Sequence, residues 1–369
     1  MEQAFQAFRP YLLPTIFTIV LVGLLPLVAG YLSLLERKVM ADMQARLGPM
    51  RVGPHGLLQP IADALKLLIK EDIIPLEADK WVFWLAPIIS VTAALTVFSL
   101  IPFSHRFYVT DSNVGLLLIL GISSLGIFGI ILGGWASNSH YPLLGALRSA
   151  AQLVSYEVAM GFSIIGGLLL AGTLGMRGVV EAKRTSGVWF AFYQPVAFFI
   201  FVVASVAETN RAPFDLPEAE SELVAGYHTE YSGFRWSLYM LAEYCEMIVV
   251  SAVAVTLFLG GWLSPFPNVH VWPLTWLHRL PPELWFLGKV FVFIYAFIWY
   301  RGTFPRYRFD QLMHLGWHFL IPLAMVNVIF CAMGIGWAEA KGWSLGASLW
   351  IGNLLTLLMA VFLARPKER

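Results

Sequence analysis

Acidic side chains are concentrated in one stretch of this chain. The 23 Asp and Glu residues include six within positions 207–236: Glu208, Asp215, Glu218, Glu220, Glu222 and Glu230. The sequence on both sides of this stretch is strongly apolar. Carboxylates in or beside a low-dielectric region are costly to ionise, so their pKa values respond to small changes in the surroundings. The pattern is typical of groups that take up and release protons.

The spacing within this stretch allows a shared proton. Glu218 and Glu222 are four residues apart, so a helix would bring their like charges together and raise at least one pKa, while Glu220 would point elsewhere. An ordinary hydrated acidic loop accounts for the same spacing equally well. The position beside apolar segments favours the proton site.

Further carboxylates lie within or at the end of apolar segments: Glu157, Glu208, Glu243 and Glu246. An unpaired buried carboxylate is costly unless it is protonated or hydrated, so we predict that these groups pass a proton along. The alternative is static pairing, for which the sequence offers four candidate partners: Ser155, Tyr156, Tyr244 and Lys289. We expect Lys289, near the start of its segment, to snorkel to the surface instead.

The composition predicts a membrane protein. Hydrophobic residues make up 58% of the chain and charged residues 13%, with a mean hydropathy of +0.71. Apolar runs long enough to cross about 30 Å of hydrocarbon occur near 11–33, 81–103, 114–134, 150–174, 188–208, 237–262, 283–300, 316–337 and 343–364. We therefore predict an all-α polytopic bundle that forms one integral membrane domain over residues 1–369.

Basic residues predict the orientation of this bundle. Placing the N-terminus outside puts 16 of the 24 Lys and Arg residues in inside segments, seven outside and Lys289 within a span, as the positive-inside rule requires. The C-terminus is then cytoplasmic, and the long loops 34–80 and 209–236 lie on the same side. Residues 59–71 of the first loop carry Asp63, Lys66 and Lys70 on one face and apolar side chains on the other, which predicts an amphipathic helix in the membrane interface. A surface helix packed on the protein's own spans would show the same pattern.

The sequence indicates no redox centre of its own. Cys245 and Cys331 occupy separate apolar segments, which excludes a four-cysteine cluster and indicates packing residues. His314 and His318 are four residues apart but have no second pair in another span, so we expect no metal or haem. A partner would have to supply any redox cofactor.

Three long segments of the chain resemble one known family. They are LERKVMADMQARLGPMRVGPHGLLQPIADALKLLIKED from Leu35, GGWASNSHYPLLGALRSAAQLVSYE from Gly133 and AETNRAPFDLPEAESELVAGYHTEYSGFRW from Ala207. They resemble the H subunit of proton-translocating NADH:quinone oxidoreductase, respiratory complex I, whose mitochondrial counterpart is NADH dehydrogenase subunit 1. The similarity runs from about Leu35 to Trp317 and continues weakly into the next span.

The resemblance implies a fold, a substrate and partners. It implies eight core spans and a long chamber for quinone, with the iron–sulfur clusters and FMN in hydrophilic partner subunits and with small and antiporter-like subunits in the membrane arm of a bacterial inner membrane. The resemblance places these residues at the quinone chamber: Arg37, Arg46, Asp63, Arg211, Phe214 and Asp215. It places these in a funnel of carboxylates leading to the pumping subunits: Glu157, Glu208, Glu218, Glu220, Glu222 and Glu243.

The chain departs from the family pattern in two places. Glu246 is an extra acid, either a further proton station or a polar packing residue. Residues 343–364 form a ninth span, expected to be peripheral.

Two other functions remain open from the sequence. The membrane subunit of an energy-converting hydrogenase has the acidic funnel but uses no quinone, and a nickel–iron partner would reveal it. A free-standing proton-coupled transporter would work without hydrophilic partners; the lack of visible internal repeats weighs against it.

Overall fold

The structure, a computed structural model, describes residues 2–215, 225–265 and 280–363, with side chains from Thr15 onward. All regular elements in these ranges are helical, which confirms the predicted all-α class. Eight helices within these described ranges are long and apolar enough to cross a membrane. They are α1 (Glu2–Met43), α3 (Lys80–Val97, extended by η2, Phe98–Leu100), α4 (Gly115–Ala136), α5 (His140–Ala171), α10 (Gly233–Phe258), α11 (Pro282–Thr303), the run from α12 (Phe309–His314) through the π-helix η5 (Leu315–Leu320) to α13 (Ile321–Lys341), and α14 (Leu345–Leu363).

The shorter elements connect these helices. They are η1 (Pro54–Gly56), α2 (Gln59–Ile69), α6 (Met176–Ser186), α7 (Phe190–Tyr193), α8 (Pro195–Glu208) and η3 (Gly226–His228). The Asp79 carboxylate caps α3 by accepting from the Trp81 amide. Helices α5, α6 and α13 end at glycines with left-handed backbone, at Gly172, Gly187 and Gly342.

The apolar run at 188–208 differs from the single helix that we predicted. It is divided at Gln194 into α7 and α8. The 14 residues of α8 extend only about 21 Å, less than the hydrocarbon thickness. Pro195, which lacks an N–H and restricts the residue before it, begins the second piece.

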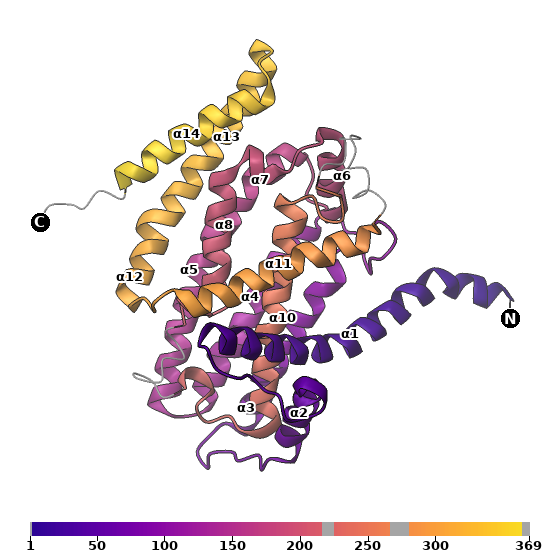
Figure 1. The fold of residues 1–369 in the computed structure, drawn as a ribbon, viewed down its shortest axis with the longest axis vertical. Helices are drawn as coiled ribbons and strands as arrows, with labels where there is room; N and C mark the ends of the chain where they lie inside the picture. The colour runs from indigo at the N-terminus through magenta and orange to yellow at the C-terminus, as the bar shows by residue number, and fades with distance from the viewer. Residues whose placement is uncertain (1, 216–224, 266–279, 364–369) are drawn as a thin grey trace, which may run out of the picture.

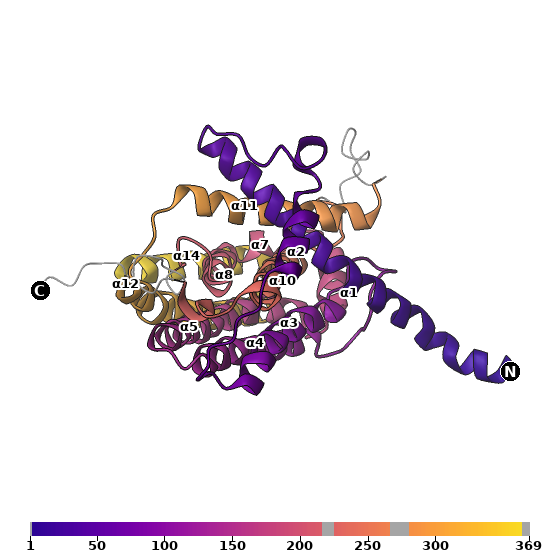
Figure 2. The same ribbon diagram turned by 90° about the horizontal axis from the view of Figure 1, so that it is seen from below.

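Helix α10 is the central element of the bundle. Its apolar window is 78% buried, more than that of any other candidate span in the described residues. Figure 2 shows α1, α2 and α11 on one side of α10, and α3, α4 and α5 on the other. Helices α3 and α4 approach closely because Gly129 faces Ser90 and Ala86, where a Cβ would collide with backbone atoms.

Two lysine side chains cap the C-terminal end of α10. The position of one of them, Lys289, differs from the sequence prediction. Lys289 does not snorkel. It is buried, and its ammonium group donates to the carbonyl oxygens of Leu259, Gly261 and Leu263 at 2.6–3.0 Å. Lys183 of α6 donates to the Thr256 carbonyl at 2.6 Å. These donors satisfy carbonyl groups that a helix C-terminus leaves without partners.

Helices α2 and α14 lie at the edges of the bundle (Figure 1). Helix α2 forms within the predicted segment and leaves Ile61, Leu65 and Leu68 exposed, so its apolar face does not pack on the described part of the chain. Helix α14 packs on α13, and the Asn353 amide donates to the Tyr193 carbonyl at 2.7 Å. The predicted peripheral span is thus tied to the break between α7 and α8.

Candidate functional site

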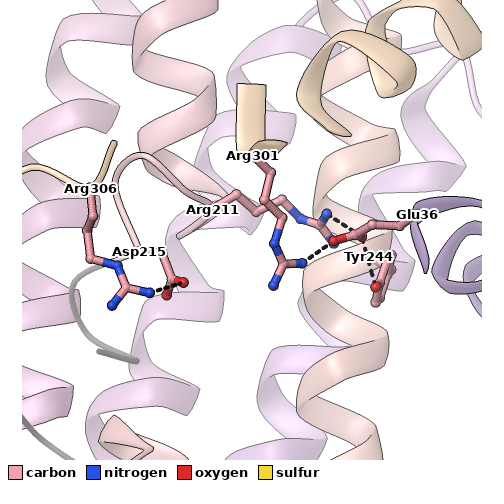
Figure 3. Close-up of polar contacts among 6 residues, drawn as sticks. All are labelled: Glu36, Arg211, Asp215, Tyr244, Arg301 and Arg306. Atoms are coloured by element: carbon pink, nitrogen blue, oxygen red, sulfur yellow. Dashed lines mark hydrogen bonds and ion pairs between the residues drawn. The ribbon is translucent and has the colours of Figure 1, made fainter. Parts of the chain in front are cut away.

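A buried glutamate accepts hydrogen bonds from three side chains, two of them arginines, that are distant from it in the sequence (Figure 3). Glu36 of α1 accepts from Arg211 at 2.7 Å and from the Tyr244 hydroxyl of α10 at 3.0 Å. Arg301 of α11 donates to the other carboxylate oxygen. The Arg211 guanidinium also lies 4.6 Å from the centre of the Tyr244 ring. Since Glu36 and Arg211 are both buried, each charge depends on the other for compensation.

A second ion pair lies beside this cluster (Figure 3). Arg306 donates to the Asp215 carboxylate at 3.2 Å. Burial raises the pKa of Asp215, and the Arg306 and Arg301 guanidinium groups oppose that shift. The other carboxylate oxygen, Oδ1, is buried with no hydrogen-bond partner in the described residues. The pKa of Asp215 therefore depends on the neighbouring guanidinium charges.

An apolar pocket of about 370 Å³ adjoins these ion pairs. It is formed by α8, the segment after it, the end of α11 and η5. Its lining includes Phe199, Phe214, Tyr300, Tyr307 and Phe319. Phe214 precedes Asp215 and Tyr300 precedes Arg301, so an apolar compartment and a charged one share a boundary. That arrangement suits an amphipathic ligand.

The six predicted chamber residues fall into separate places. Arg211, Phe214 and Asp215 lie together in the segment after α8. Arg37 of α1 pairs with Asp63 of α2 at 2.6 Å on a more exposed surface, and Asp63 also accepts from Gln59 at 3.0 Å. The third group is Arg46 alone, which is exposed beyond the end of α1.

A small enclosed cavity brings three carboxylates together inside the bundle. Glu157 of α5, Glu208 of α8 and Glu246 of α10 line a cavity of about 30 Å³. The Ser124 hydroxyl of α4 donates to Glu157. One oxygen of Glu208 is buried without a hydrogen-bond partner in the described residues. Glu243 does not line the cavity; it accepts from the Tyr227 hydroxyl at 3.0 Å.

None of the four static partners suggested by the sequence is seen bonded to a cavity carboxylate in the described ranges. The Tyr156 hydroxyl donates to the Leu312 carbonyl, and the Ser155 hydroxyl to the Ala151 carbonyl. Tyr244 bonds to Glu36, and Lys289 caps α10. Glu218, Glu220 and Glu222 lie outside the described residues.

Sequence reasoning missed Glu36, Arg301 and Arg306, and it did not pair Tyr244 with Glu36. Glu36 adjoins Arg37, which the resemblance did single out, and the run from Tyr300 to Arg308 holds three arginines. Arginine clusters near apolar segments could have drawn attention to them. The pairing itself joins residues up to 265 positions apart, and no local pattern reveals that. In the described ranges, no group of three His, Cys, Asp or Glu residues could hold a metal ion.

Comparison with known proteins gives a consistent result. The NADH dehydrogenase family model matches residues 15–332. The NADH-quinone oxidoreductase H subunit 2 of Solibacter usitatus is 52% identical over 381 positions, covering 88% of this chain and 97% of the relative. The H subunit 1 of Koribacter versatilis is 49% identical, with 87% and 91% covered. The H subunit 1 of Geobacter metallireducens is 50% identical, with 82% and 90% covered. The chain therefore belongs to the NADH dehydrogenase family, as an integral membrane H subunit of NADH-quinone oxidoreductase.

Proposed function

We propose that this chain forms the membrane part of a quinone chamber and couples quinone reduction to proton translocation. One observation carries the proposal: an apolar pocket, a cluster of ion pairs and a cavity lined by carboxylates each include residues of α8 or of the segment directly after it. The family assignment favours this function over a hydrogenase subunit or a free-standing transporter.

The first two compartments suit the two ends of a quinone. The aromatic pocket beside Phe214 would hold apolar parts of the molecule, and guanidinium groups would donate to its carbonyl oxygens. Arg37, Asp63 and Arg46 would line the outer part of the chamber, and Arg211 and Asp215 the inner part. Quinone is the bound substrate in this proposal, and electrons come from an iron–sulfur cluster in a hydrophilic partner subunit, which receives them from FMN.

Charge on the quinone would then draw protons into the chain. A negative charge placed about 10 Å from a carboxylate costs roughly 1.7 kcal/mol at an effective dielectric near 20, a little over one pKa unit. The acids at 218, 220 and 222 would take part in this uptake together with Glu243, Glu208 and Glu157. The protons would pass toward antiporter-like membrane subunits.

The orientation follows from the basic residues. We place the N-terminus outside and the C-terminus in the cytoplasm of a bacterium, with the acidic stretch on the cytoplasmic side of the inner membrane. The interrupted α7 and α8 count as one crossing in this arrangement. The exposed apolar face of α2 would rest in the membrane interface.

Photolabelling tests the quinone site. The intact complex in native membranes is illuminated with an azido-quinone carrying an isoprenoid tail, and labelled peptides are mapped by mass spectrometry. We expect label on Phe214, Tyr300 or Tyr307, reduced by excess unlabelled quinone, because these residues line the pocket. Label confined to residues outside the pocket and the two ion-pair groups would contradict this placement.

A further inference from the structure

Glu246 shares a cavity with two carboxylates from other helices. It lies in α10, and the same cavity is lined by Glu157 of α5 and Glu208 of α8. A buried water needs about 10–15 Å³ of such space, so a cavity of about 30 Å³ can hold one or two waters. The carboxylates can therefore exchange a proton through water without direct contact.

The rest of the cavity wall offers little to hold a charge. Apart from the Ser123 hydroxyl, it consists of Gly126, Ile127, Ile130, Leu153, Val249 and Val250. No basic residue lines the cavity within the described ranges. The other titratable groups near Glu246 are on its own helix: Glu243, one turn away, and Cys245, which is buried. The surroundings of Glu246 are thus acids and apolar groups.

Glu246 lacks the contacts that a structural carboxylate would have. In the part of the chain that the structure describes, it makes no hydrogen bond or ion pair. Gly126 of α4 faces it, and a Cβ there would lie 3.4 Å from a carboxylate oxygen of Glu246. An acid packed for structural reasons would be held by donors, because burying a carboxyl group without a hydrogen bond is costly. A carboxyl that gains and loses a proton needs only water and neighbouring acids.

The position of Glu246 connects two parts of the proposed path. Glu243 bonds to Tyr227, just after the acidic stretch, and does not reach the cavity. Glu246 lies three residues further along α10, about 4.5 Å along the axis on a neighbouring part of the same face. Glu208 and Glu157 line the cavity from other helices. Glu246 is therefore the group on α10 that reaches both Glu243 and the cavity pair.

We propose that Glu246 is a proton station that passes protons between Glu243 and the pair formed by Glu208 and Glu157. In each transfer, the O–H bond of a protonated carboxyl breaks, its proton joins a cavity water, and that water gives another proton to the next carboxylate. Total charge is conserved, and no redox partner is required. The inference rests on the proposed proton-coupling function.

The test uses the whole complex in inverted membrane vesicles. Glu246→Gln keeps the size and polarity of the side chain but cannot ionise, whereas Glu246→Asp keeps a titratable group. The measurements are NADH:quinone reductase rate, quenching of a ΔpH-sensitive dye, and NADH:hexacyanoferrate reductase rate, which reports electron entry without quinone. Glu181→Gln, at an exposed position of α6, is the matched control, and Glu157→Gln is measured in parallel.

The inference predicts that Glu246→Gln lowers the quinone reductase rate and the ΔpH signal about tenfold or more with hexacyanoferrate reduction unchanged, since a positioned proton-transfer group contributes about 10²–10⁴-fold. Glu246→Asp recovers much of this loss, which a packing role would not produce. If Glu246→Gln is fully active while Glu157→Gln is defective, the role proposed for Glu246 is wrong, and the proton path through Glu157 is unaffected. Full activity of both would overturn the proton path and the inference with it.

Discussion

Replacing Arg211 with leucine is expected to reduce the amount of assembled complex and to abolish quinone reduction. Glu36 would keep only Tyr244 and the half-exposed Arg301 as partners. Breaking a buried ion pair costs about 3–5 kcal/mol, and we expect about 3 here because those two contacts remain. The measurements are the yield of the complex on native gels, its thermal midpoint in mild detergent, and its quinone reductase rate.

A double substitution separates stability from function at the same place. Glu36→Gln combined with Arg211→Leu removes both buried charges and leaves an acceptor for the Tyr244 hydroxyl. Because replacing both members of a buried pair is often close to neutral, assembly should largely return. Quinone reduction should not return, because the guanidinium that we propose to bind the quinone is still missing. Recovery of quinone reduction in the double variant would show that the pair has only a structural role.

Replacing Glu157 with glutamine is expected to lower the quinone reductase rate by about 100-fold while the hexacyanoferrate rate stays unchanged. Glutamine keeps an acceptor for the Ser124 hydroxyl and fits the same space, so the loss comes from the titratable proton. Vesicles assayed for both reactions provide the measurement.

Ser124→Ala is the matched control for Glu157. It removes the hydrogen bond but leaves the carboxyl, so it should reduce the rate only a few-fold, in line with a hydrogen bond worth about 1 kcal/mol. A Ser124→Ala defect as large as that of Glu157→Gln would indicate that position and not protonation is what matters at Glu157.

The sequence predicted the helices well because long apolar runs leave few alternatives inside a membrane. The divided run at 188–208 escaped prediction, since Gln194 and Pro195 break a helix without lowering the apolarity of the window. Lys289 was misplaced for a different reason. Its partners are carbonyl groups at the end of α10, and sequence position alone does not show that two helix ends meet.

The candidate site was predicted only in part. Intramembrane acids are rare, so depth along each apolar run was enough to select Glu157 and Glu208, and the cavity shows them to be neighbours. The same criterion did not decide between a packing role and a proton-transfer role for Glu246. The two roles differ in the hydrogen-bond partners of the carboxyl group, and only a three-dimensional structure shows those partners. The ion pairs of Glu36 with Arg211 and Arg301 link segments 175 and 265 positions apart. Spacing carries no information about such pairs.

Proton uptake during a single reduction of bound quinone tests the central claim most directly. The purified complex, loaded with quinone in weakly buffered solution with a pH dye, is reduced by NADH within one turnover. Conversion of a quinone to a quinol consumes two protons and oxidation of NADH releases one, so the net chemical demand is one proton from solution. We expect the wild-type complex to take up more than this, because the charged quinone draws protons into the carboxylates. The excess should fall in a complex carrying Glu157→Gln and Glu208→Gln. An uptake that equals the chemical demand in the wild type, or an excess that the double variant retains in full, would contradict the account.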